Sequence, residues 1–223
     1  MLTKGMRKPK HLIFDCDGVL INSEIIANRI EADVKTELGF PITLEEQLTK
    51  FVGLGHSSPL VVEEMRRLPP DYKKIFQERL AKAYDTDLKA LPGVEELLAS
   101  LPHAKCVASS SQGPWLRHKL QLTKLNHFFG EAVYSASDVT RLKPHPDLFL
   151  HAMKTQGWKV EDCLVVEDSV PGVEAGKAAG LIVCAFLGGE HIVPDHAAKV
   201  LAAGADYVVN DIRNVRRLLA DLA

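Results

Sequence analysis

The sequence predicts an α/β protein with a doubly wound parallel sheet, Rossmann-like in its core, and an inserted all-helical domain. Short apolar runs alternate with helical patterns along most of the chain, which is typical of strand–helix–strand crossover units. Several of these runs end abruptly in polar residues, as expected where parallel strands deliver side chains to one edge of a sheet. The stretch 22–87 departs from this alternation, because its apolar residues recur only at helical spacing.

Each predicted strand is a short apolar run bounded by polar or glycine-containing segments. The runs are 12–15, 106–109, 132–135, 163–167, 182–186 and 207–209. Helical periodicity predicts helices over 25–38, 60–68 and 75–84 in the insert and over 94–101 after it. Leu91-Pro92-Gly93 marks the return to the core, since Pro and Gly interrupt regular structure. We therefore expect a core domain of residues 1–20 and 88–223 and a cap domain of residues 21–87.

Composition favours a small-molecule partner. The chain has 223 residues, 46% of them hydrophobic, and a net charge of −2, which gives no basic surplus for binding nucleic acid. No apolar segment approaches the length of a membrane span, so no membrane association is expected. The four cysteines are scattered without a Cys-x-x-Cys pair, which indicates a reducing compartment and hence the cytoplasm. A monomer is expected.

The most informative motif is Asp15-Cys16-Asp17-Gly18, directly after the first apolar run. Two carboxylates this close repel each other when both are ionised, which favours either a bound divalent cation or a proton held on one of them. A solvated Asp/Gly turn is the structural alternative. Cys16 should point to the opposite face of the chain and serve in packing.

Three later strands end in groups that would complete a reactive site. Ser109, Ser110 and Ser111 follow the second strand, Lys143 follows the third, and Glu167-Asp168 ends the fourth. Each group alone has an ordinary structural explanation, such as a helix cap or a solvated amine. Their shared position at strand ends predicts one cluster at the same sheet edge.

These motifs, in this order, resemble the haloacid dehalogenase superfamily, and specifically its phosphatase and phosphomutase branch with a helical cap after the first motif. The matching residues are Asp15-Cys16-Asp17-Gly18-Val19-Leu20, then Ser109, then Lys143-Pro144, then Glu167-Asp168-Ser169. The resemblance covers essentially the whole chain after the first ten residues.

The resemblance implies a mechanism. Asp15 would attack phosphorus to form an aspartyl-phosphate, and Asp17 would act as general acid and base, with a pKa raised by burial under the cap. Ser109 would hydrogen-bond the phosphoryl group and Lys143 would neutralise its charge. Mg²⁺ is the expected cofactor, held by the carboxylates of Asp15 and Asp168 and the backbone carbonyl of Asp17, with Glu167 close by.

Substrate contacts are expected at Ser110, Ser111 and Gln112, at Asn22, and in the cap loop at His56. His56 has an exposed loop histidine as its alternative. His191 and His196 follow the fifth predicted strand in a polar stretch where a metal site is a minor alternative.

The predicted function is a Mg²⁺-dependent phosphatase of small phosphorylated sugars or sugar acids, most similar to phosphatases of the 6-phosphogluconate type. A beta-phosphoglucomutase-like transfer is the first alternative, but Ala27 stands where those enzymes usually carry a cap histidine. A noncatalytic phosphate-binding protein and a response-regulator receiver are the others. A receiver, however, has its phosphorylated Asp on a later strand and no helical insert.

Overall fold

The computed structural model describes residues 8–54 and 58–222 and contains a six-stranded, all-parallel sheet. The strands are β1 (His11–Phe14), β2 (Ala104–Ser109), β3 (Val133–Ser135), β4 (Cys163–Glu167), β5 (Ile182–Phe186) and β6 (Tyr207–Val209). Their order across the sheet is β3-β2-β1-β4-β5-β6, so β1 lies between β2 and β4. The predicted fold class is confirmed, and all six strands lie within two residues of their predicted bounds.

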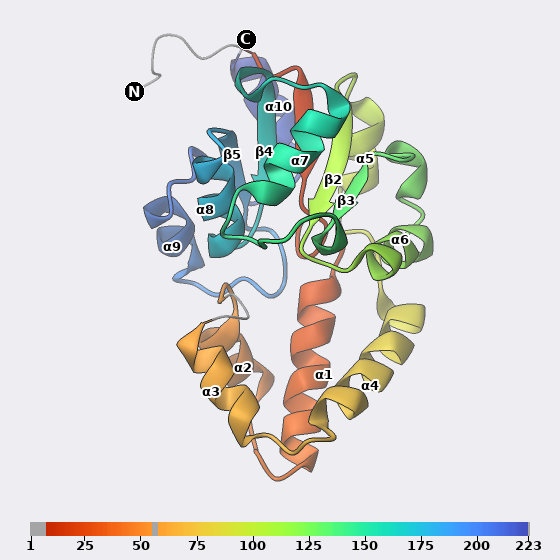
Figure 1. The fold of residues 1–223 in the computed structure, drawn as a ribbon, viewed down its shortest axis with the longest axis vertical. Helices are drawn as coiled ribbons and strands as arrows, with labels where there is room; N and C mark the ends of the chain where they lie inside the picture. Colours follow the sequence, from red (N-terminus) through yellow and green to blue (C-terminus); the bar gives the residue numbers. More distant parts are fainter. Residues whose placement is uncertain (1–7, 55–57, 223) are drawn as a thin grey trace.

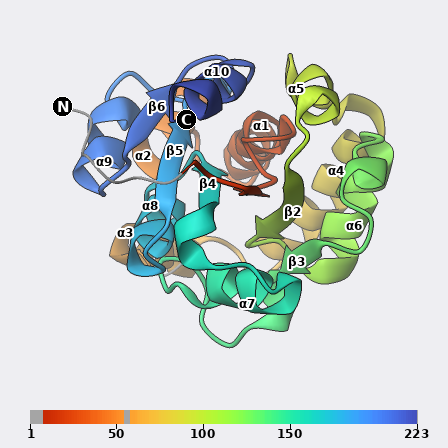
Figure 2. The ribbon, with the colours of Figure 1, turned by 90° about the horizontal axis from the view of Figure 1, so that it is seen from above.

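Helices cover both faces of the sheet (Figure 2). One face packs against α5 (Val94–Ser100), α6 (Gly113–Leu122) and α10 (Asn214–Asp221), and the other against α7 (Asp147–Gln156), α8 (Val170–Ala178) and α9 (His196–Ala202). Strand β1 serves both faces, because successive side chains of a strand point in opposite directions. Leu12 and Phe14 therefore join one apolar cluster and Ile13 joins the other. Cys16 is fully buried in the first cluster, consistent with its predicted packing role.

Four helices lie apart from the sheet, beyond the carboxyl ends of its strands (Figure 1). They are α1 (Ser23–Glu37), α2 (Leu44–Phe51), α3 (Pro59–Arg67) and α4 (Tyr72–Asp87). The periodicity predicted α1, α3 and α4 but not α2. A signal for α2 was present, since Thr43 and Glu46 form a capping box that satisfies backbone donors at its start.

A buried lysine joins three of these four helices. Lys35 of α1 is fully buried, and its Nζ lies 2.9 Å from Glu31, 3.0 Å from Gln47 of α2 and 3.5 Å from Glu64 of α3. A buried ammonium group is costly unless it is paired, so these contacts fix how α2 and α3 pack on α1.

The two chain segments that connect the helical part to the sheet are tied to each other. Ile21 and Ala90 form an isolated β-bridge. Next to it, the side chain of Asn22 accepts from the backbone N–H of Lys89 at 2.8 Å and donates to the carbonyl of Asp87 at 3.3 Å. Asn22 therefore lies where the two connecting segments meet, and we refer to these paired segments as the hinge. Of the helices in the described segments, none combines the length and apolar character that a bilayer crossing requires.

Candidate active site

The site is built where β1, β2 and β4 end side by side. Asp15 follows β1, Ser109 ends β2, and Glu167 ends β4 with Asp168 next to it. The backbone N–H of Asp15 donates to the carbonyl of Val166 at 2.9 Å, which continues the pairing with β4. Parallel strands thus bring together four polar side chains that lie up to 153 residues apart in the sequence.

Lys143 links two of these carboxylates. Its Nζ lies 2.7 Å from Oδ1 of Asp15, 2.7 Å from Oε1 of Glu167 and 3.0 Å from the carbonyl of Ala108. Burial alone would lower the pKa of Lys143, but the charges of Asp15 and Glu167 raise it above its usual value. Lys143 is therefore a permanent cation beside Asp15.

Both carboxylate oxygens of Glu167 accept hydrogen bonds from neighbouring site residues. Its second oxygen, Oε2, accepts from the backbone N–H groups of Asp168 and Ser169 at 2.8 and 2.9 Å and from the Ser169 hydroxyl at 3.0 Å. These bonds fix the turn from β4 into α8, whose first turn is capped by Ser169. Glu167 thus orients Lys143 and Asp168 from beneath the site.

Asp17 is surrounded by hydrogen-bond donors. Its Oδ1 accepts from the Ser23 hydroxyl at 2.6 Å and forms a short ion pair with Lys119. Its Oδ2 accepts from the hydroxyls of Ser111 at 2.7 Å and Ser109 at 3.1 Å. Every one of these donors stabilises the ionised carboxylate.

The pKa of Asp17 is therefore shifted in the direction opposite to our expectation. Burial raises the pKa of Asp17, but the charge of Lys119 and the hydrogen bonds from Lys119, Ser23 and Ser111 outweigh it and lower the pKa to about 2. Burial and the neighbouring carboxylates led us to expect a raised pKa, and the contact with Lys119 reverses that direction.

Lys119 is the main site residue that the sequence did not reveal. It lies on α6, is only 2% exposed, and also donates to the Ser111 hydroxyl at 2.7 Å. Glu24, in the first turn of α1, is a second such residue. Burial raises its pKa to about 7, an effect that His191 opposes and that the charges of Asp17 and Asp168 reinforce.

Asp15 and Asp168 carry the opposite shift from Asp17. Burial raises the pKa of both carboxyls well above the usual range, and the charge of Glu167 adds to the effect in each. Lys143 opposes this rise without cancelling it. Four carboxylates, Asp15, Asp17, Glu167 and Asp168, face two buried ammonium groups, so the site carries excess negative charge when all are ionised.

The sequence pattern of the haloacid dehalogenase-like hydrolases matches residues 12–186, which is most of the chain. The protein belongs to this family.

Individual relatives agree with the family assignment. The 6-phosphogluconate phosphatase of Escherichia coli is 29% identical over 199 residues, which cover 87% of this chain and 90% of that enzyme. A family hydrolase of Deinococcus radiodurans, solved with bound phosphate and sodium, superimposes with a TM-score of 0.82 at 32% identity and 96% coverage of both chains. A Thermotoga maritima protein assigned by name to the beta-phosphoglucomutases gives a TM-score of 0.73 at 26% identity, covering 94% of this chain and 99% of its own.

The predicted substrate contacts are distributed unevenly around this hydrolase site. Ser111 lies within it, and Ser110 next to it is exposed. Gln112 accepts a hydrogen bond from the Ser137 hydroxyl at 2.9 Å, and Asn22 is engaged at the hinge. His56 lies outside the described residues.

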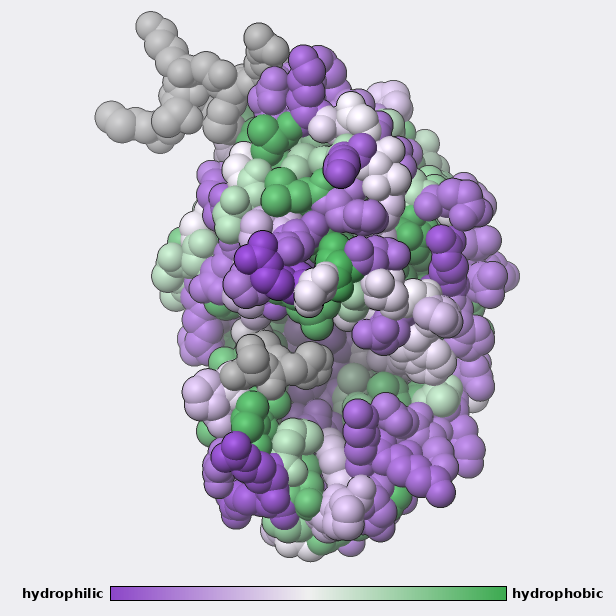
Figure 3. All heavy atoms as spheres, viewed as in Figure 1, coloured by the Kyte–Doolittle hydropathy of each residue, from purple (hydrophilic) through white to green (hydrophobic). Residues whose placement is uncertain are grey.

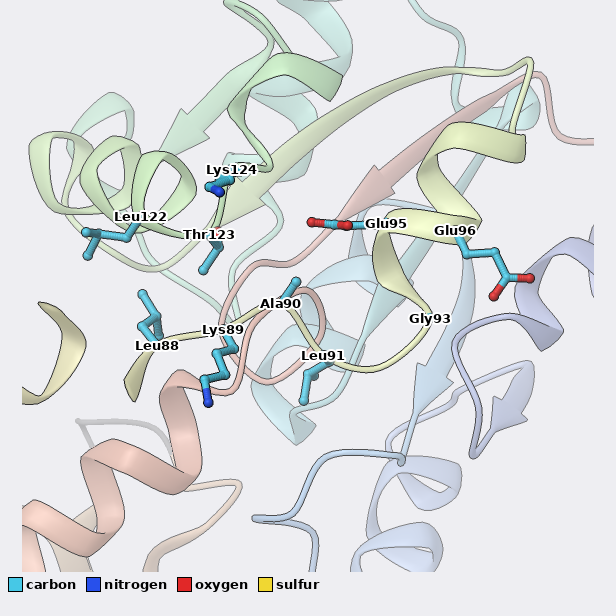
Figure 4. A pocket seen from close by; sticks show the side chains of 10 residues that line it. All are labelled: Leu88, Lys89, Ala90, Leu91, Gly93, Glu95, Glu96, Leu122, Thr123 and Lys124. Carbon is cyan, nitrogen blue, oxygen red and sulfur yellow. The ribbon is translucent and has the colours of Figure 1, made fainter. Parts of the chain in front are cut away.

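The surface is hollowed between the sheet-containing part and the four helices (Figure 3), on the side where the strands end. A separate hollow of about 550 Å³ lies beside the second hinge segment and is lined by residues of 88–96 and 122–124 (Figure 4). None of the predicted site residues lines it.

Proposed function

We propose that this protein is a Mg²⁺-dependent phosphatase that hydrolyses small phosphorylated sugars or sugar acids through an aspartyl-phosphate. The observation that carries the proposal is the contact of Asp15 with Lys143, which sets a carboxylate oxygen beside a permanent buried cation at the end of β1. An attacking carboxylate and an incoming phosphate monoester are both anionic, so their approach requires such a cation. The named phosphatase activity of the Escherichia coli relative supports the same reaction class.

In the first step the Asp15 carboxylate attacks phosphorus, a phosphorus–oxygen bond to Asp15 forms, and the bond to the sugar oxygen breaks. In the second step water attacks the aspartyl-phosphate and releases inorganic phosphate. Ser109 donates a hydrogen bond to the phosphoryl oxygens, while Lys143 balances their charge. Each step is an in-line displacement that needs little beyond positioning and charge neutralisation.

Asp17 moves the protons of both steps. Its ionised state suits the second step, in which it accepts a proton from the attacking water. In the first step it must instead give a proton to the departing sugar oxygen. An incoming phosphoryl group competes for the hydroxyls of Ser109 and Ser111 and adds negative charge, and both effects raise the pKa of Asp17.

The residues present fit a divalent cation. When ionised, the carboxylates of Asp15, Asp17, Glu167 and Asp168 outnumber the two ammonium groups, and a divalent cation would offset this excess of negative charge. No group of three His, Cys, Asp or Glu side chains among the described residues is arranged around one point. The proposed set needs only two, Asp15 and Asp168, with the carbonyl of Asp17 as a third oxygen. When bound, Mg²⁺ would neutralise charge on the phosphoryl oxygens, as in this family generally.

The four helices of residues 21–87 would act as a cap that closes over the site and selects the substrate. A phosphatase is favoured over a mutase because Ala27, on the second turn of α1, supplies no group for handling protons of a sugar phosphate. The buried free thiols of Cys16, Cys106, Cys163 and Cys184 support a reducing cytoplasm, where we expect a monomer.

The test is release of inorganic phosphate from 6-phosphogluconate, glucose phosphates and pentose phosphates, with Mg²⁺ and with a chelator. Release that requires Mg²⁺ and is lost in the Asp15→Asn variant supports the proposal. Conversion of beta-glucose 1-phosphate to glucose 6-phosphate without phosphate release would replace it with the mutase. Well-folded protein with Mg²⁺ that acts on none of these compounds would favour a noncatalytic role.

Mg²⁺ is expected to raise the melting temperature, and the increase should shrink as the pH falls. The raised pKa values of Asp15 and Asp168 mean that the metal-free folded state loses stability as the pH rises and these groups ionise. Mg²⁺ compensates the ionised carboxylates and competes with protons for them. At a hundredfold excess over Kd the gain is about 2.7 kcal/mol.

Thermal unfolding with and without Mg²⁺ between about pH 5 and 8 measures this effect. The Asp168→Asn variant should lose most of the Mg²⁺-induced increase. An increase of equal size at every pH, or one that Asp168→Asn retains, would place the bound cation elsewhere.

A further inference from the structure

Two histidines from the segment after β5 converge on Asp168. His191 Nε2 lies 2.8 Å from the carboxylate Oδ2 of Asp168, and His196 Nε2 lies 2.6 Å from its backbone carbonyl oxygen. Both rings are buried, with exposures of 4% and 0%. Both imidazoles are therefore engaged with the same residue of the proposed metal site, rather than forming a metal site of their own.

Two glycines lie directly against the ring of His191. A Cβ atom added to Gly189 would lie 2.5 Å from Cε1 of His191, and one added to Gly18 would lie 2.9 Å from the same atom. Real Cβ atoms do not approach other atoms this closely, so both positions accommodate the ring only as glycine. Gly18 belongs to the first motif, which means that the imidazole is clamped between that motif and its own loop.

This clamp has a consequence for Asp168. When Asp168 is ionised, as binding of a cation requires, its oxygens can only accept, so Nε2 of His191 then donates the hydrogen to Oδ2. The carboxylate of Asp168 is thus anchored through Oδ2 by the ring of His191.

We propose that His191 is a positioning residue that orients the Asp168 carboxylate for Mg²⁺. The inference rests on the proposed function, because it assumes that Asp168 binds the ion. Groups that hydrogen-bond a metal-binding side chain fix its rotamer before the ion arrives, and their removal typically weakens metal binding about 10- to 100-fold. His191 would act on affinity for the ion and would touch neither substrate nor metal.

The proposed test compares two replacements of His191. His191→Phe keeps an aromatic ring of similar size but removes the donor, whereas His191→Gln keeps an N–H group at about the reach of Nε2. His127→Phe is the matched control, since it removes an exposed imidazole whose Nδ1 contacts only the nearby carbonyl of Lys124. Mg²⁺ binding is measured by titration calorimetry on substrate-free protein, and Mn²⁺ binding by electron paramagnetic resonance.

The expected result is an increase in the Mg²⁺ Kd of about 10- to 100-fold for His191→Phe, a clearly smaller increase for His191→Gln, and none for His127→Phe. Circular dichroism identifies folded samples, and His191→Gln supplies the comparison with wild type if the Phe variant does not fold. Wild-type affinity in His191→Phe, or equal losses in both His191 variants, would overturn the role of the donor. Wild-type protein that binds no Mg²⁺ would instead refute the proposed metal dependence itself.

Discussion

Replacing Asp15 with Asn is expected to lower the rate of phosphate release by roughly 10⁴-fold or more. An amide oxygen is a poor nucleophile, and the variant retains every other group that we place in the site. Its folded state should be at least as stable as wild type at neutral pH without metal. The raised pKa of Asp15 shows that burial and neighbouring carboxylates oppose its ionisation, and the neutral amide removes that opposition.

Steady-state phosphate release and thermal unfolding of the same sample measure the two effects. Asp211→Asn is the matched control, because that carboxylate is partly exposed, lies outside the site and pairs with Arg213 near α10. Equal rates in Asp15→Asn and wild type would remove Asp15 as the nucleophile. A large loss of stability would show that its charge is needed by the fold.

Replacing Lys119 with Met is expected to lower the free energy of unfolding by about 3–5 kcal/mol. Met preserves the volume and length of the buried stem but leaves Asp17 in the interior without a charged partner. The pKa of Asp17, about 2 against an ordinary 3.8, sets the pH dependence. The stabilisation is present above about pH 4 and is lost as the pH falls toward 2, so the difference between variant and wild type should shrink over that range.

The ion pair between Asp17 and Lys119 is tested by urea unfolding of the wild type, Lys119→Met, a control variant and a double variant. Arg117→Met removes a half-exposed cation two positions earlier on α6 and should change stability by no more than about 0.5 kcal/mol. The double variant Asp17→Asn/Lys119→Met should recover part of the loss, because the buried charge is then absent. A Lys119→Met protein as stable as the Arg117→Met control would mean that Asp17 reaches water or another partner when Lys119 is removed.

The sheet could be predicted from the sequence, and so could the site residues at the ends of its strands. Both depend on the order of apolar and polar residues over a few positions. A run such as Leu12-Ile13-Phe14 can be buried on both faces only in a central strand, and the polar residues that follow parallel strands must meet at one edge. The same reasoning located Asp15, Ser109 and Asp168 without knowledge of the structure.

Lys119 was not predictable, because nothing in its surroundings distinguishes it from a solvated lysine. It lies 102 residues after Asp17, on a helix that also carries the exposed Arg117. Its burial depends on how α6 packs against the sheet and the hinge, which local sequence does not specify. The sign of the Asp17 pKa shift depends on that one contact, so it was unpredictable for the same reason.

The hydrogen bonds between the two hinge segments have an implication for how this protein can change. Because Asn22 and Lys89 are direct neighbours, the chain leaves the sheet and returns to it at a single point. The four helices are therefore inserted at one point of the core. Their length or composition can vary without altering the register of β1 against β2. Laboratory evolution toward new substrates should accordingly accumulate changes within residues 22–87 and spare the strand ends.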